Sequence, residues 1–260
     1  MSTTEVRYPV YVPSRGRPDK VMHFTVGNLC KDGIHPRIVV EPHEADAYRS
    51  FYDDILVIPK SHQGISYVRN WIKEHAISEG YERHWQLDDN IRYFKMVKNG
   101  ERLSARPSLI LGGTETLVDR YENVAIAGIM NSAFGHKRSG PFSTNKMVYC
   151  AVLVRSDDYR WDEELNGIED VDYSLQVVTS GVDCTILVRA FQIEKVKSGY
   201  LAGGNTDLYT EDGRLERTRA LQRKWPGIVR VERMWGRTRH NLNHVWRRFD
   251  TPLIKKEGID

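Results

Sequence analysis

The stretch "HWQLDDNIRYF", residues 84–94, places two adjacent carboxylates and an amide directly after an apolar segment. Neighbouring like charges repel each other, and a charge buried without a partner is costly. A turn explains the cluster cheaply, because Asp and Asn side chains bond to nearby backbone groups. A divalent cation also explains it, since carboxylate oxygens are ligands that such ions prefer. The segments on either side of this stretch decide between the two interpretations.

The first 90 residues alternate between short apolar runs and stretches with helical spacing. Strands are predicted at Tyr8–Val12, 36–42, Ile55–Pro59 and 83–90, and helices at 20–33, 44–52 and 64–81. Asp19 is expected to cap the first helix, and Gly33 and Gly80 are typical of helix ends. This alternation predicts an α/β fold, in which a mostly parallel sheet is flanked by helices on both faces.

The second half continues the α/β character with different elements. Met147–Val154 is the clearest strand, because β-branched and aromatic residues fill it. Residues 169–181 open with carboxylates and end in glycine, which predicts a helix. Residues 183–197 are expected to form a strand pair or one bent strand, and a glycine-rich loop follows over 198–209. A further helix is expected to end near Pro226.

No linker, internal repeat or low-complexity segment is visible in the 260 residues, so one domain is expected over 1–260. It divides into a first half at about 7–100, a second half at about 101–210 and a C-terminal segment at 211–260. Hydrophobic residues make up 40% and charged residues 28%, as in globular chains. No apolar run approaches the ~20 residues of a membrane span. The N-terminus lacks the apolar core of a secretory signal, so a cytosolic protein is expected.

The three cysteines, Cys30, Cys150 and Cys184, lie far apart and form no CxxC pair. This spacing indicates neither a zinc knuckle nor a disulfide framework, and all three are expected to be core thiols.

Polar residues follow each of the four predicted parallel strands. They are Ser14, Arg15, Arg17, Glu41, Lys60, His62, Asp88, Asp89 and Asn90. In an open sheet of this kind, ligands bind outside the carboxyl ends of the strands. Arginines suit phosphate, and carboxylates suit a hard cation that bridges phosphate oxygens. The placement therefore favours a nucleotide diphosphate with a divalent metal, and it favours the metal interpretation of Asp88, Asp89 and Asn90.

The helix over 64–81 carries a second group of candidates. Gly64 and Ser66 lie at its start, where backbone N–H groups can bind phosphate or a sugar. Arg69 can bind the carboxylates or the sugar, or it can simply lie on a solvated face of the helix.

A third group, Glu169, Asp170 and Asp172, crowds the start of the helix over 169–181. Carboxylates cap a helix start well, so capping alone can explain two of them. The alternative is a general base that accepts a proton from an attacking hydroxyl. Asp170 is the preferred base, and Glu169 is the second choice.

The C-terminal segment 211–260 is basic, with 13 Lys and Arg against 7 Asp and Glu. Trp225, Trp235 and Trp246 lie among its arginines, a pattern that suits nucleic acid but also suits core tryptophans under long arginine side chains. His240 and His244 share one face if this piece is helical, where one of them could bind a metal.

The order of these motifs resembles that of the GT-A glycosyltransferases over roughly residues 7–180. The motifs are "VPSRGRP" (12–18), "GISYVRN" (64–70), "LDDN" (87–90) and "NGIEDVDYSLQ" (166–176). In detail they are similar to the bacteriophage TET-associated glycosyltransferases. The resemblance implies a GT-A (Rossmann-like) fold with a mixed, mostly parallel sheet. It also implies transfer of a sugar from a UDP-sugar to 5-hydroxymethylcytosine in DNA, a base made by a partner TET-like dioxygenase.

The resemblance assigns expected roles to individual residues. The first half would bind the donor through Pro13, Ser14, Arg15, Arg17, Glu41, Gly64, Arg69, Asp88 and Asp89. Asp88, Asp89, Asn90 and His244 would hold Mn²⁺ or Mg²⁺, although Asn90 departs from the family's aspartate and is a weaker ligand. Asp170, or alternatively Glu169, would be the base of an inverting enzyme, and in a retaining enzyme Asp170 would position the substrate instead. Asp172, Arg237, Arg239 and Trp246 would contact the acceptor DNA.

Two rival functions remain at this point. One is a glycosyltransferase-like domain that binds nucleic acid without catalysis, which Asn90 leaves open. The other is a sugar nucleotidyltransferase, which shares the α/β layout and the carboxylate–metal chemistry. Its glycine-rich phosphate loop is poorly matched by "SRGRP", since residues 14–18 contain a single glycine.

Overall fold

The computed structural model describes most of the chain, and for residues 211, 212, 234 and 237 it describes the backbone alone. The described residues are 5–134, 140–196, 201–204, 211–234, 236–242, 246 and 248–258.

The first half folds as the predicted alternation of strands and helices. Its elements are β1 (Val10–Pro13), η1 (Pro18–His23), α1 (Thr25–Lys31), β2 (Arg37–Val40), η2 (Pro42–Glu44), α2 (Ala45–Arg49), β3 (Ile55–Val57), α3 (Ile65–Ser78) and β4 (Arg83–Leu87). The prediction of one helix capped by Asp19 is wrong, because Asp19 lies inside the short η1 and α1 starts separately. The chain packs tightly there: a Cβ on Gly27 would lie 1.9 Å from the carbonyl oxygen of Met22.

The second half adds longer strands and the C-terminal elements. They are β5 (Ile91–Lys98), β6 (Glu101–Ser104), α4 (Pro107–Val118), β7 (Val124–Asn131), β8 (Phe142–Thr144), β9 (Ala151–Arg155), η3 (Glu163–Leu165), α5 (Glu169–Thr179), β10 (Cys184–Lys195), α6 (Glu211–Lys224), β11 (Arg230–Met234) and β12 (Arg237–Asn241). The strand predicted from Met147 begins only at Ala151, because Cys150 has a left-handed backbone with φ of 71°. The segment after Asp183 is one bent strand, β10, whose pairing with β7 shifts register after Val188.

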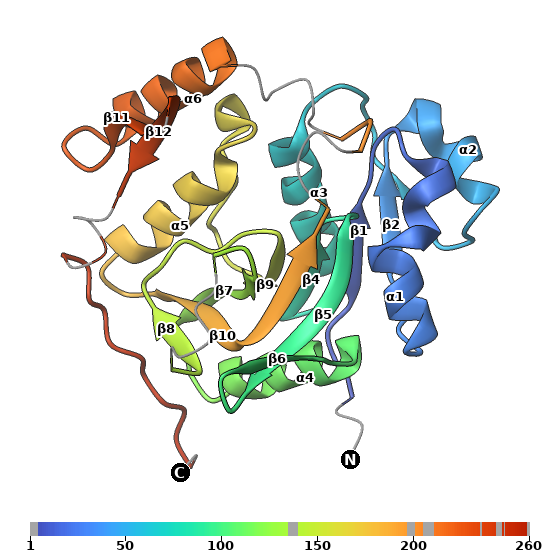
Figure 1. Ribbon diagram of the computed structural model, residues 1–260, viewed down its shortest axis with the longest axis horizontal. Helices are drawn as coiled ribbons and strands as arrows, with labels where there is room; N and C mark the ends of the chain where they lie inside the picture. The colour runs from blue at the N-terminus through green and yellow to red at the C-terminus, as the bar shows by residue number, and fades with distance from the viewer. Residues whose placement is uncertain are drawn as a thin grey trace.

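One mixed sheet runs through both halves in the order β3-β2-β1-β4-β9-β7-β10-β5-β6, and β8 pairs with β10 (Figure 1). The first four strands are parallel to one another, and β10 is parallel to β7. The remaining pairings are antiparallel. The parallel part confirms the sequence prediction, while the antiparallel strands make the sheet mixed.

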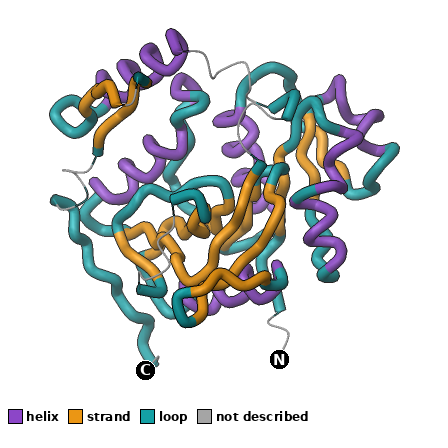
Figure 2. The backbone as a smooth tube through the Cα atoms, viewed as in Figure 1, coloured by secondary structure: helices purple, strands orange, loops and turns teal. Residues whose placement is uncertain are grey.

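Helices cover both faces of this sheet, and the layers are visible in Figure 2. On one face α1, α2 and α4 bury apolar side chains against the strands, among them Leu29, Tyr48 and Leu111. On the other face α3 contributes Ile72 to a second cluster, and α5 contributes Val177 to a third. The sheet is thus buried on both faces, so polar groups that bind ligands are left to its strand ends.

The C-terminal elements pack outside α5, at the upper left of Figure 1. Leu221 of α6 and Leu242 after β12 join Leu175 of α5 in one apolar cluster. The last described residues return to the start of β7, where Ile254 N–H donates to Asn123 Oδ1 at 2.8 Å. In the part of the chain that the structure describes, every helix is too short or too polar to span a bilayer.

Candidate active site

A cavity of about 950 Å³ lies at the carboxyl ends of β1, β2 and β4. It is lined by most of the residues that the sequence predicts for donor, metal and base: Pro13, Ser14, Arg15, Arg17, Glu41, Gly64, Arg69, Asp88, Asp89, Asn90, Glu169 and Asp170. These side chains come from five separate segments of the sequence, so the fold alone brings them together. Their individual roles stay predictions.

Asp88 lies at the centre of this group, directly after β4. Its Oδ1 accepts a hydrogen bond from Arg69 at 3.3 Å, and its Oδ2 is paired with the ammonium of Lys195. Burial alone would raise the pKa of Asp88, but Lys195 and Arg69 together hold that pKa below its usual value. Asp88 is therefore an ionised carboxylate already compensated by two protein cations.

Asp89 also lines the cavity, but both of its carboxylate oxygens are bound by the loop after β1. Its Oδ1 accepts from Arg17 at 2.6 Å and its Oδ2 accepts from Ser14 at 2.7 Å. Burial raises the pKa of Asp89, and Arg17 and Ser14 offset part of that rise. Arg17 also donates to the carbonyl oxygens of Ala202 and Gly203 at 2.9 Å each. Asp89 thus holds this arginine loop in place.

Asn90 differs from its two neighbours, because its side-chain oxygen is buried and has no hydrogen-bond partner among the described residues. Such an orphaned acceptor carries a desolvation cost. Its presence at the cavity wall marks a position where a ligand group can still bind.

Arg69 joins α3 to the start of α5. Its side chain is only 3% exposed, with Nε 3.6 Å from Glu169 Oε1 and Nη2 3.8 Å from Asp170 Oδ1. Although burial opposes its charge, the surrounding carboxylates raise the pKa of Arg69 above its usual value. The alternative of a solvated arginine is therefore wrong, and the guanidinium is a fixed positive charge beside the cavity.

Asp170 and Glu169 open α5 but face different surroundings. Glu169 is 6% exposed, and its Oε2 accepts from the Gly167 N–H at 2.7 Å. The Asp170 side chain is 28% exposed. Burial, with the nearby charge of Glu169, raises the pKa of Asp170 to about 7. A cavity-facing carboxyl with this pKa can exchange a proton near neutral pH, as a general base must.

Residues 8–204 match the family model of the TET-associated glycosyltransferases. The chain belongs to this family. It is accordingly a glycosyltransferase, and the match covers every strand of the main sheet.

Solved structures similar to this glycosyltransferase are distant ones. The inositol-1-phosphate CTP transferase of T. maritima is 11% identical, with a TM-score of 0.40 over 84% of this chain and 98% of that chain. A UDP-glucose pyrophosphorylase complexed with UDP-glucose is 10% identical, with a TM-score of 0.41 over 84% and 99%. A glycosyltransferase involved in glycosylation of the major capsid of PBCV-1 is 13% identical, with a TM-score of 0.28 over 65% and 66%. No curated protein matches the chain.

Lys195 is the main residue of the glycosyltransferase site that the sequence prediction missed. It ends β10, pairs with Asp88, and donates to Cys150 Sγ at 3.3 Å. These partners raise its pKa above the usual value even though burial lowers it. A usable signal existed, since Lys195 lies near the end of the predicted strand 183–197, but the orientation of that strand depends on pairings remote in sequence.

The start of α3 was expected to offer N–H groups to phosphate, and the structure gives one of them to protein. Ser66 N–H donates to Asn166 Oδ1 at 3.0 Å, so its expected role is corrected to a contact that joins α3 to the loop before α5. Gly64 lines the cavity with φ of 85°, and a Cβ there would lie 2.4 Å from Asn166 Oδ1. Glycine is required at this position for both reasons.

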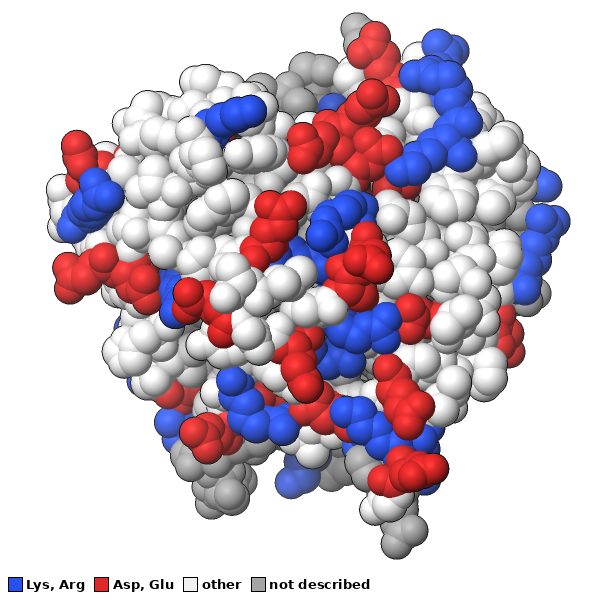
Figure 3. Space-filling view, turned by 180° about the vertical axis from the view of Figure 1, so that it is seen from behind, with Lys and Arg blue, Asp and Glu red and all other residues white. Residues whose placement is uncertain are grey.

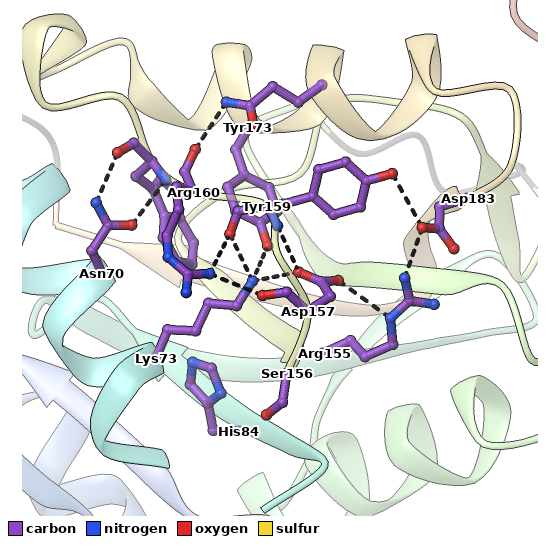
Figure 4. Close-up of polar contacts among 12 residues, drawn as sticks. Asn70, Lys73, His84, Arg155, Ser156, Asp157, Tyr159, Arg160, Tyr173 and Asp183 are labelled. Carbon is purple, nitrogen blue, oxygen red and sulfur yellow. Dashed lines mark hydrogen bonds and ion pairs between the residues drawn. The ribbon is translucent and has the colours of Figure 1, made fainter. Parts of the chain in front are cut away.

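Behind Arg69, a sealed cluster of polar side chains fixes α3 to the loop that leads to α5 (Figure 4). Lys73 is fully buried. Its ammonium pairs with Asp157 and donates to Tyr159 O at 2.8 Å and to the Tyr173 hydroxyl at 3.0 Å. Burial lowers the pKa of Lys73 to about 8. This cluster joins α3 to α5 and to the loop before it, away from the residues that line the cavity.

The prediction that Asp172 contacts acceptor DNA is wrong. Its side chain is fully buried, and it accepts from Trp225 Nε1 at 2.7 Å and from Lys224 at 3.0 Å. Asp172 therefore fixes α6 to α5. Trp225 also packs against the apolar cluster that α5 and α6 share, as the core interpretation of the tail tryptophans expected.

The other acceptor residues lie near the C-terminus. Trp246 is partly buried against the α5–α6 cluster, and Arg239 is exposed on β12. His240 lies on the same strand, so the helical pairing with His244 is wrong for this position. His244 lies outside the described residues, as does the side chain of Arg237.

Figure 3, seen from behind, shows basic side chains gathered on the side where α6 lies, next to acidic ones. The surface there is mixed in sign. A nucleic-acid contact at this segment therefore stays a prediction.

Proposed function

We propose that this glycosyltransferase moves a sugar from a UDP-sugar to the hydroxyl of 5-hydroxymethylcytosine in DNA. The family assignment supports the reaction class, and the family name associates the chain with TET enzymes. A TET-like dioxygenase would supply the acceptor, because oxidation of a methyl group on cytosine creates the hydroxyl.

The observation that carries the proposal is the placement of Asp170. It faces the cavity with a pKa of about 7, beside Arg69 and near Asp88. In the proposed step the oxygen of the hydroxymethyl group attacks the anomeric carbon of the sugar, and Asp170 accepts the proton of that hydroxyl. The bond from that carbon to the diphosphate oxygen breaks, and UDP leaves. A single displacement of this kind inverts the anomeric carbon.

Protein cations are available for the charge that develops on the departing diphosphate. Arg15, Arg17, Arg69, Arg92, Arg102 and Lys195 line the same cavity. Lys195 and Arg69 are held by the carboxylates around them, so they cost no reorganisation when the charge forms. Fixed cations that line the cavity can therefore stabilise that charge as it develops.

An aromatic pair supports a base as the acceptor. Phe134 is 62% exposed at the cavity. Its ring lies edge-on to that of Tyr149, with centroids 6.2 Å apart. Tyr149 lies close enough to Asp170 for that carboxylate to help raise its pKa, after the larger effect of burial. A cytosine turned out of the duplex could stack here with its hydroxymethyl group toward Asp170.

Divalent-metal assistance by Mn²⁺ or Mg²⁺ also remains a prediction. Each carboxylate oxygen of Asp88 and Asp89 already accepts from a protein side chain. A metal would have to displace the Lys195 ammonium from Asp88, so the residues as arranged do not fit a resident ion. The proposed step therefore uses the protein cations, and comparison of transfer in EDTA with transfer in added Mn²⁺ tests the metal prediction.

The proposal is tested by mass spectrometry of DNA incubated with the protein and a panel of UDP-sugars. Matched oligonucleotides carry 5-hydroxymethylcytosine, 5-methylcytosine or cytosine at one position. A gain of one sugar mass on the hydroxymethylated oligonucleotide alone is the expected result. Transfer to all three, or hydrolysis of UDP-sugar with no gain on DNA, would contradict the proposed acceptor.

A further inference from the structure

Three side chains that take no part in the proposed proton transfer converge beside the cavity, and Glu41 is the one of the three that lines it. Glu41 follows β2, His43 lies in η2, and His62 lies in the loop between β3 and α3. Glu41 Oε2 is 3.6 Å from His43 Nδ1 and 3.7 Å from His62 Nδ1. Among the residues that the structure describes, these form the group of His, Cys, Asp and Glu whose ligand atoms all lie within 4.8 Å of one another.

One carboxylate oxygen of Glu41 has no hydrogen-bond donor among the described residues. Its side chain is 6% exposed, and its Oε1 accepts a hydrogen bond from the backbone N–H of His62 at 3.0 Å. Its Oε2 is buried without a hydrogen-bond partner among the described residues. The two imidazole nitrogens are too far away to donate to it. A buried carboxylate oxygen in this state is costly, so the arrangement favours a ligand between the three side chains.

The spacing matches ligands of a small transition-metal ion. Bonds of ~2.0–2.2 Å from zinc to oxygen and nitrogen separate two ligand atoms by roughly 3.3–3.6 Å at a tetrahedral angle. The observed separations from Glu41 Oε2, 3.6 and 3.7 Å, lie at the upper limit of that range and just beyond it. We propose that Glu41, His43 and His62 form a binding site for a zinc-class transition-metal ion, with a fourth position open to water or ligand.

The ligand types decide the class of ion. Two imidazoles with one carboxylate suit Zn²⁺ and its late first-row neighbours, whereas Mg²⁺ and Ca²⁺ take oxygen ligands. His43 Nδ1 also lies 3.0 Å from Ser61 Oγ, a contact that the ion would replace. The site is thus chemically distinct from the oxygen-only cluster at Asp88, Asp89 and Asn90.

Access and position suggest what the ion does. The side chains of His43 and His62 are 47% and 69% exposed, so the ion can enter from solvent and the rings can turn toward it. Glu41 lines the cavity from the inside. Binding would connect the end of β2 to the loop before α3, and it would place positive charge next to the predicted donor site.

A titration with Co²⁺ tests the site directly, because Co²⁺ replaces Zn²⁺ and its visible absorption reports the ligand geometry. The full chain is expected to bind one equivalent with intense tetrahedral bands, which Zn²⁺ abolishes. His43→Ala and His62→Ala are expected to weaken Co²⁺ binding by at least roughly 100-fold, since even residues behind the ligands are worth 10–100-fold. Both histidines are exposed, so neither change should impair folding.

Two control variants complete the experiment. His35→Ala removes an exposed histidine that precedes β2, at the opposite end of this strand from Glu41, and should bind like the unchanged chain. Asp88→Asn should also leave the bands in place. The proposal is overturned if the unchanged chain binds no Co²⁺ at one equivalent, if the two histidine variants bind equally well, or if Asp88→Asn abolishes the bands. The readout is absorbance, so it does not depend on sugar transfer.

Discussion

Two clusters of charge lie against α3 one helical turn apart, and they differ in whether they line the cavity. Arg69 belongs to the cavity cluster, and Asp88 and Asp170 of that cluster also line the cavity. Lys73, four residues later, belongs to the sealed cluster of Figure 4 and is fully buried. One helix therefore carries one cation at the cavity and another away from it.

The balance of charge also differs between the clusters. The cavity cluster sets two cations against three carboxylates: Arg69, Lys195, Asp88, Glu169 and Asp170. The sealed cluster sets three cations against two carboxylates: Lys73, Arg155, Arg160, Asp157 and Asp183. Burial is the largest cause in both clusters: with the nearby carboxylates it raises the pKa of Asp170 to about 7, and with the nearby arginines it lowers the pKa of Lys73 to about 8. Proton transfer to a bound substrate is therefore possible in the cavity cluster, where the additional carboxylate, Asp170, faces the cavity.

The largest expected effect is on Asp170. Asp170→Asn removes the proposed base while keeping its shape, so kcat for sugar transfer should fall by about 1000-fold. Because its pKa is raised, Asp170 contributes to the stability of the folded state at pH values below 3.8, its usual pKa. This contribution is lost as the pH rises through about 7. The variant should therefore melt at a higher temperature than the unchanged chain at pH 8, with the gap closing near pH 4.

Rapid-quench assays and thermal melts measure the two effects on one preparation. A variant that transfers sugar at the normal rate would show that Asp170 belongs with the structural charges. The comparison between the clusters would then fail at its central residue.

Lys73→Met is expected to lower stability and to leave the rate of sugar transfer close to normal, the reverse of what is expected for Asp170→Asn. Breaking the buried pair with Asp157 is expected to lower the free energy of unfolding by about 3 kcal/mol. Transfer per folded molecule should stay close to normal, because Lys73 does not reach the cavity. Urea denaturation and active-site-normalised rates check the two halves of this prediction. A large loss of kcat in fully folded protein would show that the sealed cluster takes part in the reaction.

Lys195→Met tests the cation that pairs with Asp88. Loss of one fixed charge at the departing diphosphate should lower kcat by about 100-fold. Lys195→Arg is the matched control and should recover part of the rate, because it restores the charge with different geometry. If Mn²⁺ restores Lys195→Met but leaves the unchanged chain unaffected, the ammonium occupies the place of a metal. An unchanged rate would remove Lys195 from the mechanism.

The smallest predicted effect is on the pH profile. Asp170 acts as a base only when it is deprotonated, so kcat should rise about tenfold for each pH unit below a pKa of about 7 and level off above it. The rate of the Asp170→Asn variant should lack this rise. A flat profile for the unchanged chain between pH 5.5 and 8 would contradict the assignment.

The sequence allowed prediction of the parallel part of the fold and of the residues at its strand ends. Alternating apolar and helical patterns are local, and parallel strands necessarily present their ends at one edge. Arg17 and Asp88 could therefore be assigned to one site before any contact was known, whereas Asp170 was added to it by the family resemblance.

What could not be predicted depends on contacts between remote segments. Lys195 meets Asp88 only because β10 runs parallel to β7 and antiparallel to β5. The resemblance assigned Asp172 to the acceptor, yet α6 packs over it and buries it. Asn166 accepts the N–H of Ser66 across 100 positions of sequence. None of these pairings leaves a periodic or compositional signal.

We propose that the cavity cluster, with Asp170 as base, glycosylates hydroxymethylated DNA. The most direct test is the mass of a 5-hydroxymethylcytosine oligonucleotide after incubation with the unchanged chain and with Asp170→Asn, each supplied with the same UDP-sugar panel. We expect the gain of one sugar with the unchanged chain and almost none with the variant. Equal gains with both proteins, or no gain with either for any UDP-sugar, would contradict it.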